Sequence, residues 1–145
     1  MTEIEFHFNV PDKLAYSCRL LRKVYRSGNR AVVVAEPEVL GQLDALLWNF
    51  SATEFLPHCR ADAAQITLAA TPLLLTAELS GCPSDSVLIN LAKTLPDEFE
   101  RFERFIEVVS GHDEDRILGR RRWKHYQDRG YALKRHDLSP AVKTA

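Results

Sequence analysis

The first quarter of the chain changes from one hydrophobic period to another. Residues 4–10 (Ile-Glu-Phe-His-Phe-Asn-Val) alternate apolar with polar side chains, which predicts a β-strand that ends at Pro11. From Asp12, a suitable helix N-cap, apolar side chains recur every three or four positions to about residue 27. This period predicts an amphipathic helix, and Gly28 at its end suits the left-handed conformation that stops many helices.

The same order of elements is then repeated. Residues 31–35 (Ala-Val-Val-Val-Ala) form a continuous, largely β-branched run, which is typical of a strand covered on both faces in a parallel sheet. A second helix is predicted from Pro37 to about Trp48, because proline and acidic residues occupy its first turn. Strand, helix, strand and helix joined by short connections predict a right-handed βαβ unit.

The rest of the chain continues the alternation with shorter elements. Residues 49–65 are predicted to form a long loop. The pattern then predicts strands at 66–69, 73–76, 87–91 and 105–109, a short helix from Pro96, and a last helix from 113 to about 129. The first two of these strands are spaced for a hairpin. We expect a single Rossmann-like α/β domain over 1–135, three layers with a mostly parallel twisted sheet flanked by helices, and a flexible C-terminal tail over 136–145.

The distribution of charge along the chain is more informative than its overall composition. The 145 residues are 46% hydrophobic, as in an ordinary globular domain, and their formal net charge is only −1. That total hides a division, because residues 116–145 contain nine Lys and Arg against two Asp and Glu, whereas residues 1–115 contain ten against eighteen. A basic C-terminal segment on an acidic body predicts an electrostatic docking surface.

The sequence argues against an export signal, a membrane span and a cysteine framework. Met1 is followed by Thr-Glu-Ile-Glu, and the apolar stretch 66–79 is short for a bilayer crossing and contains Pro72 and Glu78. The three cysteines are widely spaced and form no Cys-x-x-Cys pair. We therefore expect a cytoplasmic protein that makes no membrane contact.

Motifs for catalysis or cofactor binding are missing from the sequence. The six glycines form neither a dinucleotide-binding fingerprint nor a phosphate-binding P-loop, and there is no GxSxG nucleophile turn. The five histidines show no metal-ligand spacing, and His7 falls on the outward phase of its strand, where we expect solvent exposure. We therefore expect no catalytic residue, no metal and no cofactor.

The last predicted helix contains the most informative pattern. At about 100° per residue, Arg116, Arg120, Lys124 and Gln127 fall within one quadrant of its surface, with Trp123 beside them. Three interpretations fit this basic ridge. It is a solvated helix face whose tryptophan covers the edge of the core, a phosphate-binding surface for single-stranded nucleic acid, or a receptor for an acidic peptide that ends in a hydrophobic side chain.

Arg122 belongs to a different face of that helix. It lies between Leu118 and Tyr126, which we expect to pack on the sheet. An arginine in this position either extends its charged end to solvent or pairs with an acid.

The order of these pieces resembles the chi subunit family of bacterial DNA polymerase III holoenzyme over nearly the whole chain. Each piece alone is weak, and the resemblance comes from their order and spacing. The matching pieces are Phe-His-Phe at 6–8, Tyr-Arg-Ser-Gly-Asn-Arg at 25–30, Leu-Asp-Ala-Leu-Leu-Trp at 43–48, Phe-Leu-Pro-His at 55–58, Val-Leu-Ile-Asn-Leu at 87–91, Phe-Ile-Glu-Val-Val at 105–109, Arg-Arg-Arg-Trp-Lys-His-Tyr at 120–126 and Gly-Tyr at 130–131.

The resemblance implies a non-catalytic accessory subunit of the clamp-loader assembly. Such a subunit binds the psi subunit and the acidic, hydrophobic-ended C-terminal tail of single-stranded-DNA-binding protein, and it reaches DNA indirectly. By the resemblance, Arg120 and Lys124 hold carboxylates of the tail and Trp123 walls the pocket for its terminal aromatic side chain. Gln127 stands where an arginine is common in the family, and Arg116 lies on the same face.

A second aromatic surface, formed by Trp48, Phe55 and His58, resembles a partner-binding surface of the same family. Plain packing of the long loop is the alternative for these residues. Two other functions remain as alternatives for the whole protein, namely a small nucleotide-binding enzyme on a Rossmann-like sheet and a direct binder of single-stranded nucleic acid.

Overall fold

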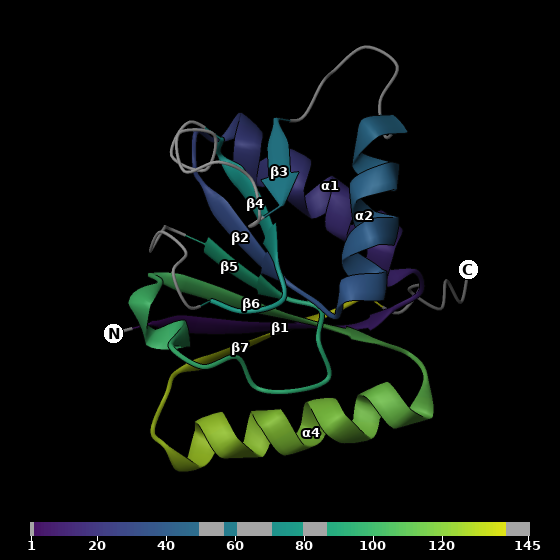
Figure 1. Ribbon diagram of the computed structural model, residues 1–145. Helices are drawn as coiled ribbons and strands as arrows, with labels where there is room; N and C mark the ends of the chain where they lie inside the picture. The colour runs from purple at the N-terminus through teal and green to yellow at the C-terminus, as the bar shows by residue number, and fades with distance from the viewer. Residues whose placement is uncertain (1, 50–56, 61–70, 80–86, 139–145) are drawn as a thin grey trace, which may run out of the picture.

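A computed structural model describes residues 2–49, 57–60, 71–79 and 87–138. Seven strands in these ranges form one sheet in the order β3-β4-β2-β5-β6-β1-β7, and every neighbouring pair is parallel (Figure 1). The strands are β1 (Glu3–Val10), β2 (Ala31–Val34), β3 (His58–Arg60), β4 (Leu73–Thr76), β5 (Val87–Asn90), β6 (Arg104–Ser110) and β7 (Leu133–Asp137).

Helices cover both faces of this sheet. Figure 1 shows α1 (Lys13–Arg26) and α2 (Pro37–Asn49) on one face and α4 (Asp113–Asp128) on the other, where it runs along β1, β6 and β7. A short 3-10 helix, η1 (Phe99–Arg101), follows the position expected for a helix after Pro96. The described part therefore has the three-layer Rossmann-like arrangement that the hydrophobic pattern predicts.

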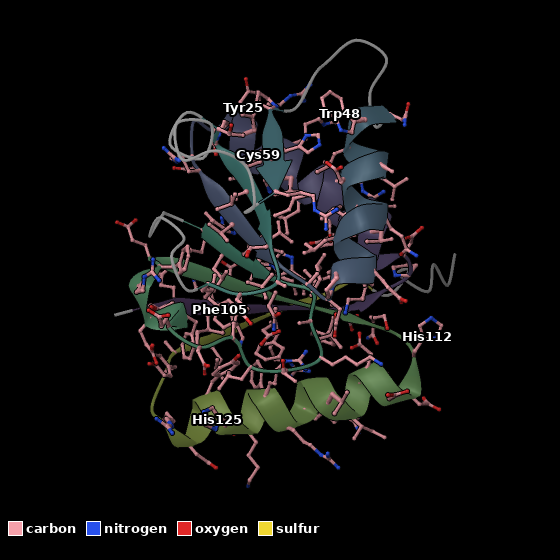
Figure 2. All side chains as sticks on the ribbon, in the orientation of Figure 1. Tyr25, Trp48, Cys59, Phe105, His112 and His125 are labelled. Carbon is pink, nitrogen blue, oxygen red and sulfur yellow. The ribbon has the colours of Figure 1, made fainter. Side chains whose placement is uncertain are left out.

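Two apolar cores fill the space between the sheet and the helices on its two faces. Strand β2 is buried along its whole length, with Val33 facing the α1 and α2 side and Val32 facing the α4 side. The core on the α4 side is rich in aromatic residues, and Figure 2 shows Phe105 between the sheet and α4. None of the helices in the described ranges combines the length and apolar character that crossing a bilayer requires.

The first helix begins and ends where the sequence predicts. The Asp12 side chain accepts a hydrogen bond from the backbone N–H of Ala15, 3.1 Å away, and so caps α1. Beyond the last turn, Gly28 adopts a φ of 79°, a left-handed conformation that costs glycine little. The connection to β2 can therefore be short.

Two strands lie where the sequence pattern predicts no strand. The three residues of β3 fall inside the expected long loop, and β7 includes residues 136 and 137 of the expected flexible tail. Strand β4 does form, but it pairs in parallel with β2 and β3. The predicted strand 66–69, its hairpin and residues 139–145 lie outside the described residues.

Candidate functional site

A cavity of about 460 Å³ opens between α4 and the β1–β7 edge of the sheet. We call it the α4 pocket. Four elements line it, because α4 packs on β1 and β6 while β7 extends the sheet beside them. Its lining residues are Phe6, Phe8, Asn9, Val109, Arg116, Gly119, Arg120, Trp123 and Arg135.

The floor of the α4 pocket is apolar. The Trp123 ring stands edge-on to the Phe6 ring, with 5.1 Å between the ring centroids, so the indole is fixed against β1. Gly119 brings the helix close to the sheet, because a Cβ atom built there would lie 3.0 Å from both γ-carbons of Val109. Gly119 and Val109 both line the pocket at this close approach.

Three arginines surround this floor. Arg116 and Arg120 are exposed on successive turns of α4, and Arg135 extends from β7. The Arg135 guanidinium lies 5.3 Å from the Phe8 ring centroid and 5.9 Å from that of Trp123, within cation–π range. Within the described residues Arg120 has no carboxylate partner, and Arg116 has only a 3.9 Å contact with the exposed Asp113. The rim can therefore accept carboxylates from outside.

A buried polar cluster positions α4 on the sheet. Glu107 of β6 is fully buried and accepts hydrogen bonds from Arg122 Nε at 3.0 Å, the Tyr126 hydroxyl at 2.6 Å and Asn90 Nδ2 at 2.9 Å. Burial raises the pKa of Glu107, while the Arg122 charge and the hydrogen bonds oppose that rise. Arg122 thus pairs with a buried acid, one of the two possibilities that its position in the sequence allows.

A second polar cluster positions β7 beside β1. Glu5 contacts the Arg104 guanidinium, with Oε2 at 2.5 Å from Nε, and its Oε1 lies 3.2 Å from Nε2 of both His7 and His136. The hydrogen bond from His7 and then that from Arg104 hold the pKa of Glu5 well below its ordinary value, although burial acts in the opposite direction.

The expectation that His7 is exposed is wrong. It is 6% exposed, and its Nδ1 atom hydrogen-bonds to the Tyr16 hydroxyl of α1. The polar phase of β1 turns toward a helix that supplies a polar partner, and a period of two cannot tell such a face from a solvated one.

The structure gathers only some of the residues expected in the basic site. Arg116, Arg120 and Trp123 line the α4 pocket, whereas Lys124 and Gln127 are exposed on α4 outside its lining. The lining residues that the sequence did not single out come mainly from the sheet: Phe6, Phe8, Asn9, Val109, Gly119 and Arg135. Phe6 and Phe8 share one phase of the β1 alternation, so the sequence pattern alone could have placed them on one face of the strand. Arg135 could be found only by recognising β7.

The second aromatic surface lies at the far end of the molecule. Trp48, at the end of α2 (Figure 2), is 58% exposed. Its ring meets the His58 ring edge-on, with the centroids 5.1 Å apart. His58 is buried, and its Nε2 atom lies 2.9 Å from Oδ1 of Asp44. Leu46 on the same helix is also exposed. Phe55 lies outside the described residues.

The crevice at the carboxyl ends of the strands is a third distinct region. This is where open α/β sheets usually bind nucleotides. Here a cavity of about 470 Å³ follows β2, β4 and β5, and its polar lining includes four acids: Glu36, Glu78, Asp97 and Glu98. Their charge opposes the binding of phosphate groups.

The fold and the α4 pocket define a class of protein, namely a small α/β domain with an arginine-rimmed pocket on the helix that closes its sheet. The comparisons with known proteins are more specific. The family model for the DNA polymerase III chi subunit, HolC, matches residues 1–134. The DNA polymerase III subunit chi of Pseudomonas aeruginosa is 30% identical over 145 residues, covering 95% of this chain and 98% of that protein. This chain belongs to the DNA polymerase III chi subunit family.

Solved structures that resemble the chain support the fold. The C-terminal domain of Saccharomyces cerevisiae Dbp5, bound to Gle1 and IP6, superposes with a TM-score of 0.59 at 12% identity, over 97% of this chain and 92% of that one. A longer S. cerevisiae Dbp5 structure with Nup159, Gle1, IP6 and ADP gives a TM-score of 0.62 at 13% identity. There the match covers 96% of this chain but only 42% of the other. At these identities the likeness establishes only a shared α/β architecture.

Membership of the family also sets the general role. The chain is a chi subunit of DNA polymerase III, an accessory subunit of the replication machinery. Its fold class and its family agree with the resemblance that the order of sequence pieces carries.

Proposed function

We propose that this chi subunit is a non-catalytic, cytoplasmic adaptor that binds the psi subunit and the acidic C-terminal tail of single-stranded-DNA-binding protein. It thereby tethers the clamp-loader assembly to coated single-stranded DNA. The observation that supports the tail site is the α4 pocket, in which an apolar floor is rimmed by Arg116, Arg120 and Arg135. A peptide with carboxylates next to a terminal hydrophobic side chain matches both parts of that surface.

The proposed contacts divide by chemistry. The terminal side chain of the tail packs on Trp123 and Phe6, and its carboxylates lie against Arg120 and Arg135. Lys124, one turn beyond Arg120 and exposed, adds attraction from outside the pocket. Because these cations are at the surface, affinity should decrease as the salt concentration rises.

Calorimetric titration with an acidic peptide that ends in an aromatic residue tests the site. Arg120→Ala and Arg135→Ala should each weaken binding by about 1–3 kcal/mol, while Lys124→Ala has a smaller effect. Arg121→Ala is the matched control, because Arg121 is an exposed α4 arginine outside the pocket. Unchanged affinity in both the Arg120 and Arg135 variants would rule out the α4 pocket as the tail site.

For the psi subunit we propose the second aromatic surface as a docking region, on the exposure of Trp48 and Leu46. Trp48→Ala should weaken co-purification with psi and leave the affinity for the tail peptide unchanged. Loss of peptide binding in this variant, or full retention of psi, would contradict the assignment of separate surfaces.

The two alternatives make different predictions. A nucleotide-binding enzyme would show a clear thermal stabilisation by ATP, GTP, NAD or S-adenosylmethionine. The acidic crevice at the carboxyl ends of the strands disfavours the binding of such nucleotides. A direct nucleic-acid binder would retard single-stranded DNA strongly in gel shifts without any other protein. Either result would count against the adaptor.

A further inference from the structure

Glu5, His7 and His136 place three potential metal-ligating atoms within 4.8 Å of one another. Glu5 and His7 are successive members of one phase of β1, and His136 is brought beside them by the parallel pairing of β7. The cluster lies on the opposite face of these strands from the α4 pocket, since Phe6 and Arg135 occupy the alternate phase. It belongs to neither of the docking surfaces described above.

We propose that Glu5, His7 and His136 form a binding site for a divalent transition-metal ion of the zinc class. Two imidazoles and one carboxylate are a ligand set that suits Zn²⁺ and leaves the fourth coordination position for water. Glu5 and His7 are buried, while the His136 side chain is 50% exposed. An ion can therefore enter from solvent beside His136.

The spacing of the ligand atoms fits such an ion. Oε1 of Glu5 lies 3.2 Å from Nε2 of His7 and 3.2 Å from Nε2 of His136. Two ligand atoms about 2.1 Å from zinc at a near-tetrahedral angle are roughly 3.4 Å apart. The two imidazole rings, 4.6 Å apart between centroids, approach the same carboxylate oxygen from two strands. Small side-chain movements are enough to bind the ion.

The surroundings provide the outer contacts that metal ligands need. When His7 ligates through Nε2, its Nδ1–H can donate to the Tyr16 hydroxyl, which fixes the ring. The Arg104 guanidinium holds Oε2 of Glu5 at 2.5 Å and leaves Oε1 toward the histidines, although its second nitrogen also lies 3.1 Å from Oε1. Because only three protein ligands hold the ion and the nearby Arg104 cation repels it, we expect a dissociation constant on the order of micromolar, weaker than in four-ligand structural sites.

Titration of tag-free, chelator-treated protein with Zn²⁺ tests the site, with Co²⁺ as a spectroscopic probe. The unmodified chain should bind one equivalent of Zn²⁺ and show the visible d–d absorption of a low-coordinate Co²⁺ complex. His136→Ala should weaken binding by at least tenfold, and Glu5→Gln should do the same with near-native shape. His112→Ala is the matched control, because His112 is exposed at the N-cap of α4 (Figure 2), whereas the cluster lies on β1 and β7.

Three outcomes would overturn the proposal. The first is the lack of one-to-one binding by the unmodified chain. The second is an unchanged affinity in His136→Ala. The third is a Co²⁺ spectrum dominated by thiolate charge transfer, which would place the ion on cysteines. A circular dichroism spectrum of each variant establishes that it is folded before its affinity is compared.

Discussion

Glu5 and Glu107 are carboxylates on neighbouring strands, and each meets an arginine, but their surroundings differ. Glu107 and its partner Arg122 are almost completely buried between α4 and the sheet. Glu5 is equally shielded, yet its partner Arg104, at the start of β6, is 42% exposed. The pKa of Glu107 is raised by burial, whereas that of Glu5 is lowered by hydrogen bonds from His7 and Arg104.

The difference shows how each cluster contributes to the α4 pocket. The Glu107 cluster fixes α4, which carries Arg116 and Arg120, through contacts closed to water. The Glu5 cluster fixes β7, which carries Arg135, through contacts that partly face water. We therefore expect the helix side of the pocket to depend strongly on its ion pair and the strand side to depend on it weakly.

Removing the buried arginine is expected to have the largest effect. Arg122→Ala leaves Glu107 without its cation in a site that water does not reach, so it should lower the free energy of unfolding by about 3–5 kcal/mol. Urea denaturation measures the loss. Arg121→Ala, at the exposed neighbouring position, should change stability by less than about 0.5 kcal/mol. Equal losses in the two variants would mean that the Glu107 cluster does not fix α4.

The second-largest loss of stability is expected at the close approach of α4 to the sheet. Gly119→Ala adds a methyl group 3.0 Å from two carbons of Val109, so overpacking should cost about 2 kcal/mol and exceed the gain in helix propensity.

Gly41→Ala in α2 is the matched control for this variant, because nothing lies within 4 Å of its added methyl group. It should stabilise the protein by roughly 0.5–1 kcal/mol. Thermal melting of both variants decides, and stabilisation by both would show that the helix can move away from the sheet without cost.

Removing the exposed arginine completes the comparison. In Arg104→Ala, Glu5 keeps its contacts with His7 and His136, and water can reach it where the partly exposed Arg104 side chain is removed, so the loss should be only about 1 kcal/mol. The measurement is urea denaturation in the presence of a chelator. A loss as large as that of Arg122→Ala would remove the distinction between the two clusters.

A third carboxylate, Asp115, is expected to make the smallest contribution to stability, and this contribution depends on pH. Asp115 accepts hydrogen bonds from the Ser110 N–H at 2.7 Å and from Lys13 Nζ at 3.2 Å. Burial raises its pKa, but the Ser110 N–H and the Lys13 charge outweigh burial and hold it below the ordinary 3.8. A lowered pKa in the folded state contributes stability above pH 3.8, and that stability disappears as the pH falls further.

Asp115→Asn should therefore lower stability by roughly 0.5–1 kcal/mol at neutral pH and by progressively less below pH 4. Melting temperatures between pH 3 and pH 7 measure this dependence. Asp113→Asn is the control, because that side chain is 95% exposed in the same helical turn. A constant difference across the pH range would contradict the proposed role of the charge.

Periodicity predicts the long elements of this fold because their apolar faces are regular. Helix α1, strand β1 and helix α4 match their expected positions within a few residues. Strands β3 and β7 are missed for different reasons. Only three residues of β3 pair with the sheet, and β7 is an edge strand whose sequence Leu-Lys-Arg-His-Asp is almost entirely polar. Polar edge strands leave no apolar alternation to detect.

The same distinction separates the site residues that the sequence predicts from those that it does not. Arg116, Arg120 and Trp123 were predictable because helical spacing alone places them on one face. Arg135 and the Glu5–His7–His136 cluster were not, because they depend on the pairing of β1 with a strand that sequence periodicity misses. Long-range pairing is a property of topology, and one sequence taken alone does not specify it.

The position of β1 in the sheet has a consequence for how the chain is made. Of the described strands β1 is synthesised first, but its two neighbours are β6 and β7, with Glu5 and Arg104 separated by 99 positions and Asn9 and Asp137 by 128. Until these strands have been synthesised, β1 is an unpaired apolar edge, open to aggregation or to chaperones. A nascent chain that ends before β7 therefore lacks Arg135, which lines the α4 pocket, as well as one of the two strands that pair with β1.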